Sequence, residues 1–336
     1  MDFQALSIVD MFVSKGKGSD FDRGSSRMIT KQKIRNFFEA GMIADALGVP
    51  VEFNQRDTYT VSTMQGYGTY NQPAGSWSDD SSLTLCLAET LAEKGDADAC
   101  MTKFVDYLEH GSYTPSGKLF DIGNATREAI FNFEIKSTSA IEAGSRSPSA
   151  NGNGALMRIA PLAFACLKCA RPERQRQIRE FTTITHGHIR SIIANDLYVE
   201  CLRAMLLGMP LIEAMAEAWD VIEVAGYPQK ELALFKNIHD TTFAITPRQN
   251  IRSSGYVIDS FEAAMWCALN EQTLRGVCLL AVNLGEDTDT IAQIAASLYA
   301  AGHLDEQAPP PWRYVLIHTR QEERIVETFA EKFCDE

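Results

Sequence analysis

The chain has 336 residues, of which 45% are apolar and 22% charged, and its formal net charge is −13. This composition is typical of a globular protein with one large domain or two ordinary ones. The acidic charge argues against broad nucleic-acid binding, which requires a basic surface. No apolar run approaches the roughly 18 residues of a membrane helix, and the start, MDFQALSIVDMF, lacks the basic segment of a signal peptide.

The eight cysteines are scattered, mostly inside apolar stretches with helical spacing. This distribution predicts reduced, buried thiols and a cytoplasmic protein. Cys166 and Cys169 form a C-x-x-C pair. Neither a second such pair nor a neighbouring histidine accompanies it, so a zinc or redox site is not favoured.

Residues 1–30 differ in character from the rest of the chain. The short amphipathic piece FQALSIVDMFV is followed by the Gly/Ser-rich, charged stretch SKGKGSDFDRGSSR. The second stretch is typical of a flexible linker. We therefore expect an N-terminal arm over 1–30, either a disordered tail or a partner-binding segment, ahead of one domain over 31–336.

From about Ile34 onward, apolar residues recur at helical spacing and strand alternation is missing. The pattern predicts an all-α fold with a single compact multi-helix domain. The basic run from Arg171 to Arg179 is typical of a solvated helix face. The expected helices lie near 34–48, 83–95, 156–167, 193–208, 257–268, 291–302 and 325–333.

Two acidic clusters each stand where a helix should begin. The first is Ser78-Asp79-Asp80, and the second comprises Glu286, Asp287, Asp289 and Thr290. Each cluster taken alone is open to interpretation as a helix cap. Capping needs one acid, however, and the surplus acids repel one another. Asp, Ser and Thr oxygens are ligands of Mg²⁺ or Mn²⁺, so the clusters predict a metal site if the fold joins them.

Two further acids stand near the end of the first expected helix. Asp45 falls on its apolar stripe, where a charge is costly unless it is paired, and Glu52 follows shortly after. Asp45 is either a buried, paired or hydrogen-bonded acid, or a carboxylate that supports catalysis.

Three loops could contact a substrate. Gly152-Asn153-Gly154 is either an ordinary turn or a set of backbone N–H groups for an anion such as phosphate. His186 and His188 suggest a polar pocket wall or a surface loop rather than a metal site, because no acid stands beside them. Asp121, in FDIGN, is either a turn residue or the contact for a cationic substrate group.

At these residues the chain resembles the ADP-ribosylglycohydrolase family. The family pattern runs G-D-A-x-G with a following Glu, W-T-D-D-T, G-N-G-x-x-M-R, T-H and G-G-D-x-D-T, and the five motifs occur in that order across roughly residues 31–305. The matching segments are Asp45–Gly48 with Glu52, Trp77–Ser81, Gly152–Gly154 with Met157 and Arg158, Thr185-His186, and Gly285 with Asp287–Thr290. The departures are Ala44 for Gly, Ser78 for Thr, and Glu286 for Gly.

The resemblance implies an all-α fold with two Mg²⁺ or Mn²⁺ ions in a central cleft. Asp289 would bridge the ions, Glu52 would sit beside them as a gating or acid/base carboxylate, and Asp79 is the other candidate base. Gly152, Asn153 and Gly154 would cradle a diphosphate, His186 would line the substrate pocket, and Asp121 would face the leaving arginine. The implied metal ligands are Ser78, Asp79, Asp80, Asp287, Asp289 and Thr290.

The function implied is hydrolysis of ADP-ribose from a modified protein, with arginine as the expected linkage. An alternative is an immunity protein that blocks an ADP-ribosyltransferase toxin through residues 1–30, with or without hydrolase activity, because some relatives protect against such toxins. A third interpretation is a metal-dependent phosphohydrolase, which the absence of a His-rich ligand set disfavours. The expected partners exclude nucleic acid and membrane.

Overall fold

The protein is built from helices joined by loops. The computed structural model describes residues 28–240 and 242–335. Within these ranges the only β pairing consists of isolated bridges. The prediction of an all-α, single-domain fold is confirmed.

The helices follow one another along the chain in three groups. The first part of the chain forms α2 (Lys31–Gly48), η1 (Val49–Val51), η2 (Gly68–Tyr70), α3 (Asp79–Ala92), α4 (Ala97–His110), α5 (Asn124–Ile135) and α6 (Ala140–Ala143). The middle forms α7 (Pro161–Ala165), α8 (Arg171–Thr183), α9 (Ile189–Leu206), α10 (Leu211–Glu223), α11 (Gln229–Leu232), η3 (Ala233–Ile238), η4 (Phe243–Ile245) and η5 (Arg248–Asn250). The last part forms α12 (Val257–Asn270), α13 (Leu274–Val282), α14 (Thr288–Gly302), α15 (Pro310–Val315) and α16 (Arg320–Phe333).

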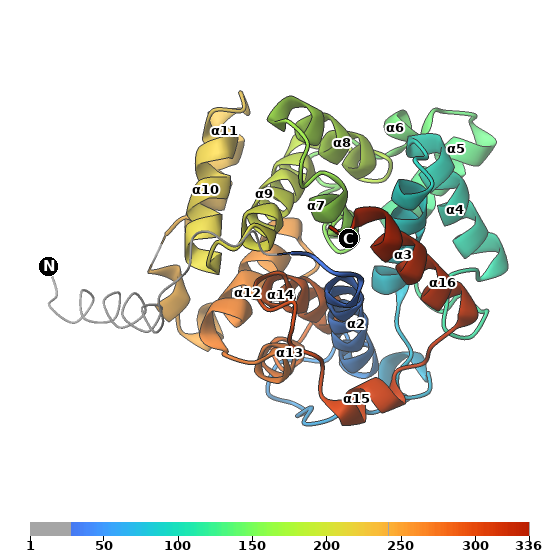
Figure 1. Cartoon of the computed structure of the whole chain (residues 1–336), viewed down its shortest axis with the longest axis vertical. Helices are drawn as coiled ribbons and strands as arrows, with labels where there is room; N and C mark the ends of the chain where they lie inside the picture. Colours follow the sequence, from blue (N-terminus) through green and yellow to red (C-terminus); the bar gives the residue numbers. More distant parts are fainter. Residues whose placement is uncertain (1–27, 241, 336) are drawn as a thin grey trace, which may run out of the picture.

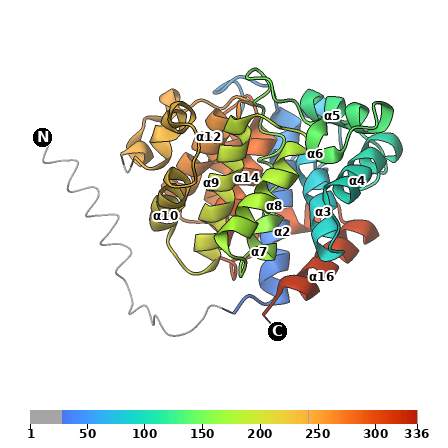
Figure 2. The same cartoon turned by 90° about the horizontal axis from the view of Figure 1, so that it is seen from above.

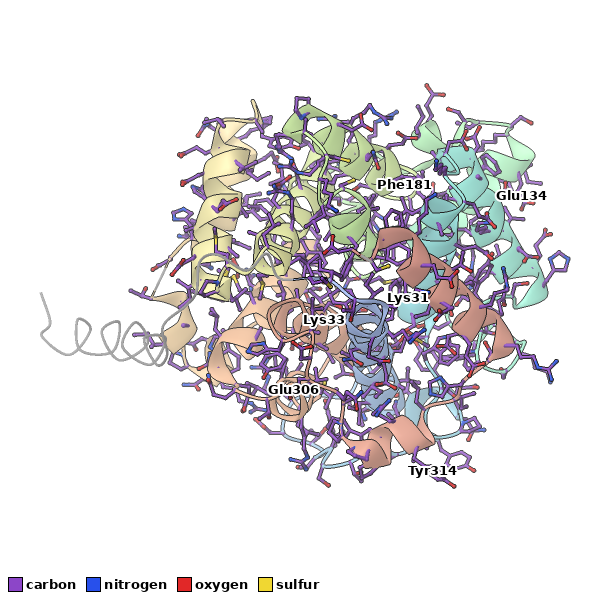
Figure 3. All side chains as sticks on the ribbon, in the orientation of Figure 1. Lys31, Lys33, Glu134, Phe181, Glu306 and Tyr314 are labelled. Atoms are coloured by element: carbon purple, nitrogen blue, oxygen red, sulfur yellow. The ribbon has the colours of Figure 1, made fainter. Side chains whose placement is uncertain are left out.

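Helices α2 and α14 pack against each other in the middle of the molecule. In Figure 1 they lie between α10 on one side and α4 on the other. Ile43 and Leu47 of α2 and Ile294 of α14 are each 0% exposed. Each such side chain stabilises the fold by about 1.5–3 kcal/mol through removal of apolar surface from water. Side chains fill the space between the helices in Figure 3, where Lys31 and Lys33 mark the start of α2.

One glycine lets the end of α2 rest on the start of α14. A Cβ atom at Gly48 would lie 2.3 Å from the Cα of Asp289, so only a hydrogen atom fits there. The Thr288 hydroxyl donates to the Gly48 carbonyl at 2.9 Å and closes the junction. The second acidic cluster is thereby placed directly at the C-terminal end of α2.

The two ends of the described fold meet at the opposite end of α2. The Ile29 N–H donates to Asp335 Oδ2 at 2.8 Å, and the Asp335 N–H donates to the Ile29 carbonyl at 2.8 Å. Figure 2 shows α2 starting beside the C-terminus and running away from it. Ile29 is 1% exposed and belongs to the core. The rest of the predicted arm, residues 1–27, lies outside the described residues.

Two local expectations were wrong. The third predicted helix, 156–167, is mostly turn, and only α7 (Pro161–Ala165) is helical. Pro161 has no N–H to continue an earlier turn, so it starts a new helix. The basic run on α8 is not simply a solvated face, because Arg174 is 6% exposed and pairs with Glu200 at 2.7 Å. The spacing of apolar residues also did not predict four of the helices, namely α4, α5, α10 and α13.

Two further observations concern the cysteines and the helix lengths. The predicted burial of the thiols is confirmed for six cysteines, namely Cys86, Cys100, Cys166, Cys201, Cys267 and Cys278. Among the described residues, no helix has both the length and the apolarity that crossing a membrane requires.

The α2–α14 junction yields a stability prediction. Gly48→Ala should lower the free energy of unfolding by about 1–3 kcal/mol, because the new methyl group meets the α14 backbone and the helices must separate. Gly41→Ala, on the same helix, is the matched control. Its Cβ would meet Ser297 Oγ at 3.5 Å, which is an ordinary contact. The higher helix propensity of alanine should therefore raise the free energy of unfolding by at most about 1 kcal/mol. Urea unfolding of both variants measures the two free energies of unfolding, and equal effects of the two substitutions would contradict the prediction.

Candidate metal centre and substrate site

The Asp45 carboxylate joins α2 to the start of α3. It accepts hydrogen bonds from the Ser78 N–H at 3.0 Å, the Ser81 N–H at 3.1 Å and the Ser81 hydroxyl at 2.6 Å. No ion pair to Asp45 occurs among the described residues, and its burial raises the pKa of this carboxyl to about 6. Asp45 is therefore a buried, hydrogen-bonded acid, and it holds the first acidic cluster at the end of α2.

The two acidic clusters meet at Asp80. Its Oδ2 atom accepts from the Ser78 hydroxyl at 3.2 Å and from the Thr290 hydroxyl at 3.1 Å. Asp80 and Thr290 are 210 positions apart in the chain and are 2% and 4% exposed. Two helix N-termini, those of α3 and α14, thus converge on one buried point.

Glu52, Asp287 and Asp289 form the other part of the centre. One carboxylate oxygen from each lies within 4.8 Å of the others. The Asn153 side-chain amide donates to Asp287 Oδ2 at 2.7 Å, and the Thr290 N–H donates to Asp289 Oδ1 at 2.9 Å. The acids and their supporting amide come from three separate segments, so only the tertiary fold brings them together.

The donor set fits a hard divalent cation. Glu52 Oε2, Asp80 Oδ1 and Asp287 Oδ1 are buried oxygens without a hydrogen-bond partner. A buried carboxylate oxygen is costly to leave unsatisfied, and a cation would satisfy it. The group offers carboxylate oxygens without a Cys or His ligand, which favours Mg²⁺ or Mn²⁺ over zinc.

The electrostatics of the centre lead to the same conclusion. Burial raises the pKa of Asp79, Asp80 and Asp289 well above the ordinary aspartate value, and neighbouring carboxylates raise it further. Burial and the field of Asp287 raise the pKa of Glu52 to about 9. A divalent cation would stabilise the ionised forms and reverse these shifts.

The Asp121 segment borders the centre. The Gly123 N–H donates to Asp79 Oδ2 at 3.1 Å, and the Asp121 side chain contacts those of Asp79 and Tyr70. The Tyr107 hydroxyl donates to the Asp121 carbonyl at 2.6 Å and fixes the segment. Burial raises the pKa of Asp121. The structure therefore brings this sequence-predicted residue beside the acids.

The glycine turn and His186 form another wall. A Cβ atom at Gly154 would lie 3.0 Å from His186 Cε1, so the glycine permits close packing against the ring. His186 is 2% exposed, and its burial together with the field of Arg158 lowers its pKa to about 3. The surface-loop alternative is wrong for this neutral histidine. The Asn153 N–H donates to the Gly255 carbonyl at 3.1 Å. This N–H is therefore already used for a hydrogen bond within the fold.

His188 has a different role from His186. It lies at the N-cap of α9, where Nδ1 accepts from the Arg190 N–H at 3.2 Å. His186 is therefore part of a buried wall, and His188 is a helix cap. The two do not form a metal site with the described acids.

Two supporting residues were not predicted. Arg56 donates to the carbonyls of Leu284 at 2.5 Å and Ile251 at 2.6 Å, which braces the loop before Asp287. Gln293 on α14 donates to the Thr84 hydroxyl at 3.1 Å and links α14 to α3. Neither belongs to a motif, because an arginine in a loop and a glutamine in a helix are common at solvated positions.

Glu286 differs from the family pattern, and its backbone explains the glycine usually found there. Its φ is 63°, a left-handed conformation that favours glycine. Its N–H donates to the Asn54 carbonyl at 2.9 Å, and its carbonyl accepts from the Phe53 N–H at 2.7 Å. The side chain is exposed. The extra acid therefore lies outside the buried carboxylate group.

The raised pKa of Glu52 predicts a pH dependence for the metal-free protein. Between its ordinary value of 4.5 and the folded value of about 9, folded Glu52 holds a proton that the unfolded chain releases. The free energy of unfolding should therefore fall as pH rises through this window, by up to about 1.4 kcal/mol per pH unit for each such proton.

Urea unfolding in EDTA at pH 6 and pH 8 measures this dependence. Glu52→Gln should reduce the slope, whereas Glu142→Gln, at an exposed position, should leave it unchanged. Equal slopes in the wild type and Glu52→Gln would contradict the assignment.

Glu286 gives a second prediction. Glu286→Gly should raise the free energy of unfolding by about 0.5–1 kcal/mol, because glycine adopts the left-handed conformation without steric cost. Glu213→Gly, at an exposed position in the first turn of α10, should lower it by about 1 kcal/mol. Thermal unfolding compares the two, and destabilisation by Glu286→Gly would show that the side chain matters more than the backbone.

Comparisons with known proteins identify the family of the chain. A profile of the ADP-ribosylglycohydrolase family matches residues 26–336. The chain is 33% identical over 292 residues to ADP-ribosylarginine hydrolase Tri1 of Serratia proteamaculans (strain 568), covering 84% of this chain and 74% of the relative. It is 32% identical over 279 residues to the protein of the same name from Pseudomonas putida (strain GB-1), covering 80% and 70%.

A more distant relative and a solved structure extend the comparison. The ADP-ribosyl-[dinitrogen reductase] glycohydrolase of Rhodospirillum rubrum is 25% identical over 276 residues, covering 80% of this chain and 85% of the relative. A solved structure described as an ADP-ribosylglycohydrolase-related protein complex superposes with a TM-score of 0.72 at 26% identity, covering 89% of this chain and 96% of the other. With a family match that spans nearly the whole described fold, the chain belongs to the ADP-ribosylglycohydrolase family.

Proposed function

We propose that this protein is a dinuclear-metal hydrolase that releases ADP-ribose from modified arginine side chains. The observation that carries the proposal is the joining of two acidic clusters into one buried group with unsatisfied oxygens, beside Asp121. Two relatives named ADP-ribosylarginine hydrolase support the arginine linkage. The ADP-ribosylated protein is then the substrate partner.

The acids that meet at the helix ends would hold the cations. When bound, Mg²⁺ or Mn²⁺ would polarise a water molecule and orient the sugar hydroxyls. The unsatisfied oxygens of Glu52, Asp80 and Asp287 are available for this purpose. The full set of proposed metal ligands is Ser78, Asp79, Asp80, Asp287, Asp289 and Thr290, with Glu52 beside them.

The reaction replaces one bond at the anomeric carbon with another. A water oxygen forms a bond to that carbon, and the bond from carbon to the guanidine nitrogen breaks with its electron pair going to nitrogen. Glu52 or Asp79 would accept the water proton, and the leaving guanidine then takes up a proton to become guanidinium. Asp121 would attract this cation as it forms.

The Gly152–Gly154 turn would position the diphosphate. The close packing of Gly154 on His186 leaves no side chain between this turn and the pocket wall. His186 is neutral because burial lowers its pKa to about 3. It would therefore act as a polar wall and hydrogen-bonding surface rather than as a charge for the phosphates.

Removal of one central acid tests the proposal. Asp289→Asn should lower kcat/KM for ADP-ribose release from an arginine-modified protein by at least about 100-fold, because electrostatic stabilisation of the transition state is lost. The assay contains Mg²⁺ or Mn²⁺, and EDTA should abolish the activity of the wild type.

The matched control is Asp305→Asn, which removes a surface acid paired with Lys33 at 3.5 Å and should leave the rate unchanged. Circular dichroism verifies folding of each variant. Wild-type activity in an Asp79→Ala and Asp289→Ala double variant would contradict the proposal.

The alternative of an immunity protein rests on the arm. Its residues 1–27 lie outside the described part of the chain, so the alternative stays a prediction from sequence composition. Deletion of residues 1–27 separates the two functions, because hydrolysis should survive the deletion while arm-mediated blocking of a transferase toxin should not.

A further inference from the structure

Three aromatic side chains form a row along the border of the acidic centre. The ring centroids of Phe53 and Tyr70 are 6.3 Å apart, and those of Tyr70 and Phe120 are 5.3 Å apart. Phe53 is 69% exposed, and the other two rings are half-buried. A row of rings with one end in solvent offers apolar faces to a ligand.

The fold holds Phe53 in place at a conformational cost. Its φ is 66°, which is uncommon for a bulky residue. The hydrogen bond from the Phe53 N–H to the Glu286 carbonyl, 2.7 Å long, secures the conformation. Burial of the ring does not explain this arrangement, because most of the side chain remains exposed. The arrangement instead fixes an aromatic face next to Glu52.

Acids accompany the row at two points. Glu52 directly precedes Phe53, and Asp121 directly follows Phe120. The Tyr70 side chain interacts with both carboxyl groups. The row therefore combines ring faces with two carboxyl groups.

This combination suits a guanidinium group. A planar, delocalised cation stacks on aromatic faces and donates hydrogen bonds to a carboxylate in the same plane. A serine acceptor has neither property, and an ammonium group lacks the planar fork. The rings also provide a surface for the aliphatic stem of an arginine side chain.

We propose that Phe53, Tyr70 and Phe120, with Asp121, form a subsite that binds the guanidinium and stem of the modified arginine. The inference deepens the proposed function and rests on it for the identity of the reaction. It assigns the preference for arginine to aromatic stacking in addition to the charge of Asp121. The carboxylates at the helix ends would then act on the sugar, while the aromatic row would select the side chain that leaves.

The experiment measures how strongly two compounds inhibit the hydrolysis of ADP-ribosyl-arginine by the full chain in the presence of Mg²⁺. Agmatine probes the guanidinium subsite, and ADP-ribose probes the remainder of the site. Phe53→Ala should raise KM and the agmatine inhibition constant roughly tenfold through loss of the stacking face. The kcat value and the ADP-ribose inhibition constant should change less than about twofold, and Phe53→Trp should restore agmatine inhibition.

Tyr67→Ala is the matched control. Tyr67 is 65% exposed with φ 66° and directly precedes η2, which ends at Tyr70. It has no ring contact with the row among those found in the described structure. Its replacement should leave both inhibition constants unchanged. Unchanged agmatine inhibition in Phe53→Ala overturns the proposal, as do an equal rise for ADP-ribose or an equal effect of Tyr67→Ala.

A wild-type protein that does not cleave the arginine linkage would refute the proposed function separately. Calorimetric titration of agmatine into the wild type and Phe53→Ala then decides the subsite. Binding that Phe53→Ala weakens supports it, whereas equal binding or no binding overturns it.

Discussion

Repulsion among buried carboxylates is the constraint on which the rest of this structure depends. Asp80 and Asp289 reach the same buried region from the starts of two helices, and Glu52 joins them from the end of η1. The positive ends of the helix dipoles offset part of the repulsion, at about 0.3–1 kcal/mol per charge. Several buried carboxylates require more than this, so the arrangement favours a divalent cation.

Neutral contacts hold the acids against this repulsion. The hydrogen bonds from Ser78 and Ser81 to Asp45 position the start of α3, and the Gly48 contact positions the start of α14. The Asn153 amide orients Asp287 from a third segment. Glu52 Oε2, Asp80 Oδ1 and Asp287 Oδ1 remain without a hydrogen-bond partner in this arrangement. The supports therefore preserve the negative charge that the proposed chemistry needs.

The helix ends and the loops have separate roles. The acids proposed to bind metal lie mostly at the starts of α3 and α14, and α14 packs against α2 in the core. The groups proposed to contact substrate stand on loops, including Phe53, Asp121 and Gly154. A rigid scaffold that carries loops allows substrate preference to change without disturbing the proposed metal centre. Glu286 illustrates the coupling between them, because its backbone connects the Phe53 loop to the second acidic cluster.

The sequence by itself determined the helical class and the presence of two acidic clusters at helix starts. Periodic apolar residues mark α2, α9, α12, α14 and α16, and surplus acids at Asp79–Asp80 and Asp287–Asp289 exceed what helix capping requires. The short α7 was overestimated, because its buried apolar residues continue into a turn that periodicity cannot distinguish from a helix.

Only the tertiary structure decided how these parts meet. It showed that Asp45 caps another helix, that His186 is a buried neutral wall, and that Arg56 braces a distant loop. It also brought Phe53, Tyr70 and Phe120 into one row. Such relations depend on contacts between segments far apart in the chain. Local periodicity carries no information about them, because hydrogen bonding and close packing between segments are set by the whole fold.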